Sequence, residues 1–127
     1  RSLAGMEERG FGRYLFFGGT NTDVVRGFRT TAAYSSAKSS LAVLVKSIAL
    51  SSAHMGVAAN VLCPGLVPTE YTDPGERAYL ERLSGDLPLL DAQELADCAF
   101  SVLESPILNA AVIPADRGVS LGNKGSV

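Results

Sequence analysis

Short apolar segments alternate with helical segments along this chain, and that alternation constrains its fold more than any other feature of the sequence. Apolar runs bounded by glycine or proline are typical of buried strands, and apolar residues three and four positions apart are typical of helices. The predicted order is strand 14–17, helix 32–54, strand 57–63, a helix that begins at Asp91, and strand 110–115. Strands joined through helices favour a parallel sheet with right-handed crossovers, so we predict an α/β fold.

The two helices have clear apolar faces. The face of the first helix consists of Leu41, Leu44, Val45 and Ile48. The second helix opens with Asp91 and Glu94, a variant of the capping box, and its face consists of Leu95, Cys98, Ala99, Val102 and Leu103. Segment 64–90, by contrast, is rich in turns, and we expect a mobile loop there with a short amphipathic stretch at 78–83.

A second stripe on the first helix consists of small residues and one lysine: Ser39, Ala42, Lys46 and Ala49. Small side chains allow close approach of another helix. We therefore expect this helix to join copies of the chain in a homo-oligomer.

The composition excludes several classes of function. The chain has 127 residues, 46% of them hydrophobic, and a net charge of -2, which fits one globular core. A slightly acidic chain has no basic surface for nucleic acid, and no apolar run approaches the ~20 residues of a membrane span. The single histidine, His54, leaves no cluster for a metal. Cys63 and Cys98 form no CxxC pair, so we expect buried free thiols and a cytoplasmic location.

In a parallel sheet, ligands bind beyond the carboxyl ends of the strands. Those ends are segments 18–23, 64–69 and 116–118, and the first helix begins beside them. Tyr34 and Lys38 lie four residues apart at that helix start, so both point to one side. A lysine ammonium and a helix N-terminus both stabilise a nearby phenolate, which lets a tyrosine exchange a proton with a carbonyl or alcohol oxygen.

Two longer motifs carry a family resemblance. Tyr34-Ser35-Ser36-Ala37-Lys38 resembles the YxxxK helix of the short-chain dehydrogenase/reductase family, and residues 60–69 resemble its N-x-x-x-PG-x-V-x-T segment. Segments 12–17 and 112–118 are similar to the family's fifth and last strands. The resemblance implies an oxidoreductase that transfers a hydride between NAD or NADP and a small-molecule carbonyl or secondary alcohol.

The resemblance also implies residue roles. Tyr34 is the expected acid/base, and Lys38 is expected to support it and to hydrogen-bond the nicotinamide ribose. The segment that includes Pro64, Gly65 and Val67 is expected to lie against the nicotinamide, with Thr69 on the carboxamide or a phosphate. The family's catalytic serine is absent, because Gly18-Gly19 stand in its place. Thr20 is the expected replacement and Thr22 the second choice.

The family's glycine-rich phosphate loop has no counterpart in this sequence. We therefore expect residues 1–127 to be the C-terminal part of a single Rossmann-type dehydrogenase domain, a partial β-α-β-α-β unit that lacks the N-terminal glycine-rich half. One alternative is an inactive remnant that acts as a structural or interaction module. A more remote one is a Ser-Lys acyl hydrolase, because Ser35 and Lys38 also form an S-x-x-K motif.

Overall fold

The computed structural model describes residues 1–122, and its centre is a three-stranded parallel sheet. The strands are β1 (Gly12–Phe17), β2 (Val57–Pro64) and β3 (Val112–Ala115), and they lie in the order β1-β2-β3. Gly12 pairs with Val57 at one end of the sheet, and Pro64 pairs with Ala115 at the other. The α/β fold with a parallel sheet is therefore confirmed.

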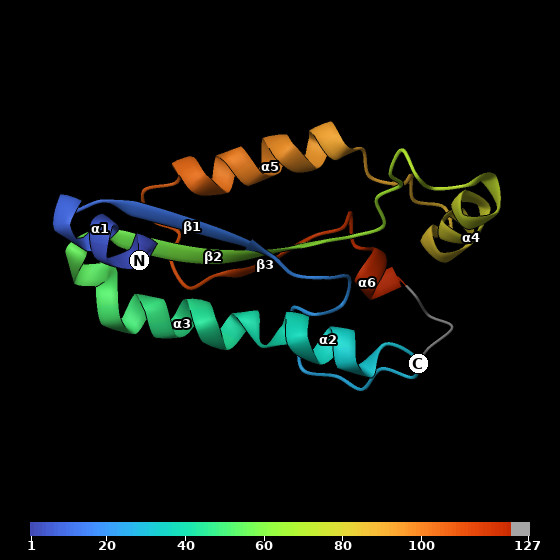
Figure 1. Ribbon diagram of the computed structural model, residues 1–127. Helices are drawn as coiled ribbons and strands as arrows, with labels where there is room; N and C mark the ends of the chain where they lie inside the picture. The colour runs from blue at the N-terminus through green and yellow to red at the C-terminus, as the bar shows by residue number, and fades with distance from the viewer. Residues whose placement is uncertain (123–127) are drawn as a thin grey trace.

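Helices cover both faces of this sheet (Figure 1). On one face, α2 (Ala32–Ser39) and α3 (Leu41–Ser52) follow each other, and η1 (Ala53–Met55) leads into β2. On the other face lies α5 (Ala92–Glu104), which contacts β1 and β2. Helix α1 (Ser2–Arg9) lies beside β1, and the short α6 (Val119–Gly122) follows β3.

Each face has its own apolar cluster against the sheet. Val45 of α3 packs with Ala59, Val61 and Cys63 of β2, whereas Leu62 packs on the opposite face with Ala99 and Val102 of α5. This division follows from β-strand geometry, because successive side chains of β2 point to opposite faces. The predicted apolar face of α5 is confirmed for Leu95, Cys98, Ala99 and Val102, whereas Leu103 is half-buried outside this cluster. The capping box also forms: the Asp91 amide donates to the Glu94 carboxylate at 3.0 Å.

The helix predicted over 32–54 is divided in the structure at Ser40. The Ser40 hydroxyl donates to the Ala37 carbonyl at 2.6 Å, and such a bond competes with the helical pattern and bends helices. The apolar stripe is also narrower than predicted, because Leu44 is exposed while Leu41 and Ile48 pack against the core.

Segment 64–90 contains a helix where we predicted only a short amphipathic stretch in a loop. Helix α4 spans Pro74–Ser84. Its start was readable in the sequence: Asp73 accepts the Glu76 amide at 2.8 Å, and Pro74 occupies the first helical position. The turn-rich composition of the whole segment concealed that signal.

Two strand predictions also need correction. Strand β3 begins at Val112 rather than Ala110, because Ala110 has a φ of 60°, outside the strand region. Strand β1 is only partly buried, since it lies at an edge of the sheet, where β2 is the one strand that pairs with it in residues 1–122. No helix in the same residues is long and apolar enough to cross a membrane.

Candidate active site

The loops that follow β1 and β2 meet at the carboxyl end of the sheet, where α2 begins (Figure 1). The Gly18 amide donates to the Leu62 carbonyl at 2.8 Å, and the Thr20 hydroxyl donates to the Pro64 carbonyl at 3.1 Å. Leu66 and Tyr34 line the same cavity. The structure therefore brings the Pro64–Thr69 segment and the Tyr34 helix to the same end of the sheet.

Tyr34 and Lys38 lie side by side on α2, as their spacing predicts. The Lys38 ammonium is 5.9 Å from the centroid of the Tyr34 ring, and it donates to the Phe17 carbonyl at 3.0 Å. The Tyr34 side chain is 57% exposed, so its hydroxyl is accessible to a ligand. The Phe17 carbonyl at the end of β1 thus holds the Lys38 ammonium beside the exposed Tyr34 side chain.

The cavity beside Tyr34 has a volume of about 350 Å³ and takes its lining from several separate segments. Its polar side chains come from α2 and from the loops around it: Thr20, Asn21, Thr31, Tyr34 and Ser35. Its apolar side chains are Phe28, Leu66, Leu83 and Val119. A ligand here meets hydroxyl, amide and apolar groups, and none of the lining residues within 1–122 is charged.

The hydroxyl groups near Tyr34 differ in how far they are available. Thr22 is buried, with 2% of its surface exposed, and its hydroxyl lies 2.8 Å from both the amide and the carbonyl of Gly19. Thr20 is half-buried and lines the cavity, although its proton goes to the Pro64 carbonyl. Of the two threonines that the sequence offered in place of a serine, Thr20 is the one that a ligand can reach.

Ser35 is also buried, and its hydroxyl lies 3.0 Å from that of Thr31. Within residues 1–122 no hydrogen bond joins Ser35 to Lys38, whose ammonium bonds to Phe17 instead. The structure therefore gives no support to Lys38 as an activator of a Ser35 nucleophile.

Gly19 lies directly against Tyr34. A Cβ atom added at Gly19 would lie 3.2 Å from both Cε1 and the hydroxyl oxygen of Tyr34. A Cβ at Gly18 would meet the Cys63 sulfur at 2.7 Å. The Gly18-Gly19 pair thus keeps this strand end close to β2 and to the phenol.

Gly65 belongs to the segment that is expected to lie against the nicotinamide, and it also has a packing role. In the structure, a Cβ at Gly65 would lie 2.8 Å from the Asp116 Cβ and 2.9 Å from the Asp116 Cα. The Gly65 amide also donates to the Ala115 carbonyl at 3.1 Å. This glycine therefore lets the loops after β2 and β3 pack together.

The rest of this segment extends from the sheet toward solvent. Val67 is half-buried, and Thr69 is exposed. The Thr69 amide donates to the Thr72 hydroxyl at 2.8 Å, and the two hydroxyls are 3.3 Å apart. Thr69 therefore belongs to a compact turn with an exposed hydroxyl.

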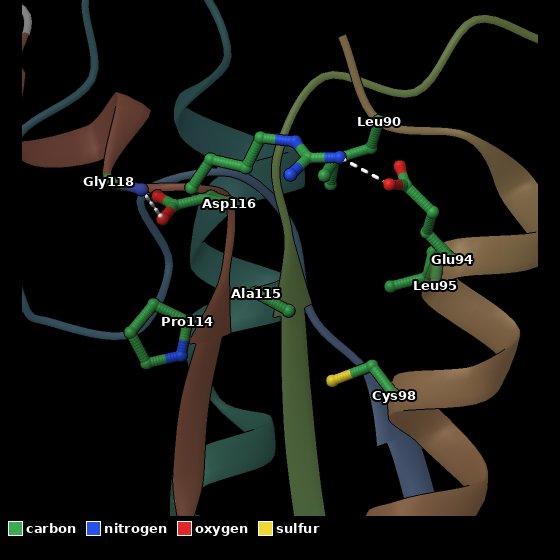
Figure 2. A pocket seen from close by; sticks show the side chains of 9 residues that line it. Leu90, Glu94, Leu95, Cys98, Pro114, Ala115, Asp116 and Gly118 are labelled. Atoms are coloured by element: carbon green, nitrogen blue, oxygen red, sulfur yellow. Dashed lines mark hydrogen bonds and ion pairs between the residues drawn. The ribbon is translucent and has the colours of Figure 1, made fainter. Parts of the chain in front are cut away.

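A second cavity, of about 380 Å³, lies between α5 and the end of β3 (Figure 2). Arg117 forms an ion pair with Glu94 at its edge, and Cys98 points toward it from α5. None of the predicted site residues lines this cavity. Cys98 is half-buried here rather than fully buried as predicted, whereas Cys63 is buried, and both thiols are free.

Three groups around the sheet have displaced pKa values. Burial raises the pKa of the Cys63 thiol, and the charges of Asp23 and Asp116 add to this, against the hydrogen bond from Thr22. The Asp91 amide and the Arg117 guanidinium lower the pKa of Glu94.

Asp116 is buried, which alone would raise its pKa, but its hydrogen bonds reverse the effect. It accepts the Gly118 amide at 2.8 Å and the Ser120 amide at 3.1 Å, and the net result is a lowered pKa. This carboxylate therefore holds the turn into α6.

Two asparagines matter more than the sequence indicated. Asn60 is buried, donates to the Leu108 carbonyl at 3.1 Å and accepts the Ala111 amide at 3.0 Å, so it fixes the chain that enters β3. Asn21 lines the Tyr34 cavity. An asparagine in a loop is such a common turn residue that its type alone did not mark Asn21 as a site residue.

Comparisons with known proteins agree with this geometry. Residues 6–120 match the family model described as enoyl-(acyl carrier protein) reductase. The 3-oxoacyl-[acyl-carrier-protein] reductase MabA of Mycobacterium avium is 30% identical over 97% of this chain and 49% of its own length. The acetoacetyl-CoA reductase of Rhizobium meliloti is 32% identical over 91% of this chain and 49% of its own length.

Among solved structures, a short-chain dehydrogenase/reductase family oxidoreductase from Burkholderia thailandensis is 28% identical, with a TM-score of 0.77. The match covers 98% of this chain and 50% of that one. The chain thus spans about half the length of the relatives that it matches. By its fold, its motifs and these matches, the chain belongs to the short-chain dehydrogenase/reductase family.

Proposed function

We propose that this chain carries the catalytic side of an oxidoreductase that transfers a hydride between NAD or NADP and a carbonyl or secondary alcohol. The observation that carries the proposal is the accessible Tyr34 phenol, which lies beside the Lys38 ammonium in a cavity that the loop after β2 also lines. Family membership supports the same reaction class.

Tyr34 is the proposed general acid and base. In the reductive direction its hydroxyl gives a proton to the substrate oxygen, and in the oxidative direction the phenolate takes that proton back. Lys38 is held beside the ring through the Phe17 carbonyl, and we propose for it the supporting role that the family resemblance implies. Thr20 lines the cavity and is the proposed replacement for the family's serine, although its hydroxyl must first release the Pro64 carbonyl to donate to a substrate.

We propose that a nicotinamide binds at the carboxyl end of the sheet. When bound, this cofactor supplies or accepts the hydride. Lys38 is proposed to hydrogen-bond its ribose, and the backbone of Pro64, Gly65 and Val67 to lie against its ring. The exposed hydroxyl of Thr69 is available for the carboxamide or a phosphate.

The wider assembly is also part of the proposal. We propose that residues 1–127 are the C-terminal part of one Rossmann-type dehydrogenase domain, in line with the half-length match to relatives. The exposed Val43 and Leu50 on α3 support a homo-oligomer formed through that helix. Two free cysteines fit the reducing cytoplasm.

An inactive remnant that serves as a structural or interaction module is the second candidate. The observation that favours it is the pair Gly18-Gly19, which puts no hydroxyl where the family has serines. In that case the Tyr34 cavity would remain because the fold is retained, but reduced nicotinamide would not bind there.

Fluorescence of reduced nicotinamide separates these candidates. NADPH and NADH are titrated into the purified chain and into a longer form that includes upstream residues. The proposal predicts a blue shift or enhancement of emission, followed by oxidation of the cofactor when a ketone is added. If only the longer form binds, the proposal stands and the upstream residues are needed for cofactor binding. The absence of binding in both forms contradicts the proposal and favours the remnant.

A further inference from the structure

A substrate oxygen beside Tyr34 needs a second hydrogen-bond donor, and the nearby hydroxyls are largely committed. The Thr22 hydroxyl is buried and bonds to the Gly19 backbone. The Thr20 hydroxyl has one proton, and that proton goes to the Pro64 carbonyl at 3.1 Å. Thr20 can donate to a substrate only after it gives up that bond.

Asn21 has no such commitment. It lines the Tyr34 cavity, and no residue from 1 to 122 forms a hydrogen bond with its carboxamide. The carboxamide oxygen is buried without a partner. Because the oxygen has no exposed surface, the NH₂ group is the end of this amide that a ligand can approach.

The backbone fixes Asn21 in the turn that contacts the Tyr34 ring through Gly19. The Thr22 amide donates to the Gly19 carbonyl at 3.2 Å, which closes a four-residue turn, and Asn21 has a φ of 62° at the third position of that turn. Positive φ at this position is typical of a type II turn, where glycine or asparagine is favoured. Gly19, the first residue of the turn, lies against the Tyr34 ring.

We propose that Asn21 is a further catalytic residue of the site, and this inference rests on the proposed oxidoreductase function. Its carboxamide NH₂ donates a hydrogen bond to the reacting oxygen of the substrate. Tyr34 still supplies the proton, and the carboxamide stays neutral throughout. A donor aimed at the oxygen on which negative charge develops stabilises the transition state more than the ground state.

The cavity narrows the class of substrate. Among residues 1–122 its lining has no charged side chain, and Phe28, Leu66, Leu83 and Val119 are apolar. A donor pair of phenol and amide requires a ligand group that accepts two hydrogen bonds, which a carbonyl oxygen does. The inferred substrate is therefore a compact, neutral ketone rather than a carboxylate or phosphate at this position.

The first arm of the test measures binding without turnover. Cyclohexanone and methylenecyclohexane, which differ in the carbonyl oxygen, are titrated into the ¹⁵N-labelled chain, and the side-chain NH₂ signals are followed by NMR. Asn21→Asp removes the Asn21 NH₂ signals and so assigns them. We expect cyclohexanone alone to shift these signals downfield. Absence of that shift overturns the inference, whether or not the ketone is turned over.

The second arm uses matched variants. Asn21→Gly keeps the positive φ and removes the carboxamide, and Gly27→Ala in the same loop is the control, because a Cβ there meets nothing within 4 Å. We expect Asn21→Gly to weaken cyclohexanone binding about three- to tenfold and Gly27→Ala to leave it unchanged. Equal binding by Asn21→Gly and wild type overturns the inference.

Kinetics separate this inference from the proposed function. In a form that turns over cyclohexanone with NADPH, Asn21→Gly is expected to lower kcat about 10²-fold with little change in KM. A kcat within twofold of wild type overturns the inference and leaves the oxidoreductase standing. Binding that depends on Asn21, with no turnover in any form, supports the NH₂ contact and contradicts the proposed reaction.

Discussion

The cavity between α5 and β3 and the cavity beside Tyr34 lie at the same end of the sheet but on different sides of it, and they use their polar groups differently. The cavity between α5 and β3 has Glu94, Asp116 and Arg117 in its lining, all charged. The cavity beside Tyr34 has hydroxyl, phenol and amide groups in its lining and, in the described part of the chain, no charged residue. By charge alone, the first cavity would be the better candidate for chemistry.

The hydrogen bonds reverse that ranking. Glu94 accepts the Asp91 amide and pairs with Arg117, and Asp116 accepts two amides of the turn into α6. These charges hold helix ends in place (Figure 2). Tyr34 is exposed, and Asn21 has no partner in the described part of the chain. A candidate reaction site is therefore distinguished from a structural network by polar groups that are free to bind a ligand, and not by the charge of those groups.

The largest difference between the cavities is expected from one side-chain substitution in each. Tyr34→Phe should lower turnover by about 10²–10⁴-fold in the form of the protein that binds NADPH, because proton transfer to the substrate oxygen is lost. Cofactor affinity should change little. Cys98→Ser, in the other cavity, is the control and should leave kcat unchanged. Undiminished turnover by Tyr34→Phe would show that the Tyr34 cavity is not the reaction site.

Gly65→Ala tests the junction between the loops that separate the cavities. Its Cβ would overlap Asp116 backbone and side-chain atoms, so we expect the free energy of unfolding to fall by about 1–3 kcal/mol. Urea unfolding followed by circular dichroism measures this change. Gly85→Ala is an unsuitable control because Gly85 has a φ of 64°, whereas Gly27→Ala adds a Cβ in open space. Equal losses in Gly65→Ala and Gly27→Ala would contradict the packing role.

The carboxylates of the α5 cavity predict a pH dependence of stability. Folding lowers the pKa of both Glu94 and Asp116 below the ordinary values of 4.5 and 3.8. Their contribution is therefore complete above those values and is lost as the pH falls through the lower folded-state values. Thermal unfolding between pH 6 and pH 2.5 should show a smaller loss in the Glu94→Gln, Asp116→Asn double variant than in wild type. Parallel curves would contradict this assignment.

The smallest effect concerns the two thiols. Burial raises the pKa of Cys63, so little thiolate forms near neutral pH, whereas Cys98 is half-buried at the edge of the second cavity. Thiolates react with alkylating reagents, so Cys98 should be labelled first by iodoacetamide at pH 7.5. Mass spectrometry of the peptides gives the order. Faster labelling of Cys63 would show that the Tyr34 side of the sheet opens more readily than the α5 side.

Much of this fold was predictable because its strands and helices have strong local patterns. Val57–Cys63 is apolar except for Asn60, since β2 is buried on both faces, and Asp91 with Glu94 marks the start of α5. The bend at Ser40 and the positive φ of Ala110 were not predictable, because each depends on a hydrogen bond or a turn rather than on apolar periodicity. Helix α4 had a readable start that the surrounding turn residues concealed.

The candidate site was predictable as a set of segments but not as a set of contacts. The spacing of Tyr34 and Lys38 and the position of residues 64–69 indicated where the site lies. The choice between Thr20 and Thr22 depends on which side chain is buried, and the sequence does not give that. The contact between Gly65 and Asp116 joins two loops that are distant in the sequence, so it was not predictable either. Asn21 was not considered at all, since only its missing hydrogen-bond partner distinguishes it from an ordinary turn residue.

The central claim is that Tyr34, Lys38 and the segment after β2 form one nicotinamide site. The most direct measurement is the intermolecular nuclear Overhauser effect between the nicotinamide protons of NADPH and the labelled protein. The account predicts contacts from the nicotinamide to the Tyr34 ring and to the methyl groups of Val67. Contacts to the Leu90 and Leu95 methyl groups of the α5 cavity, with none to Tyr34, would contradict it.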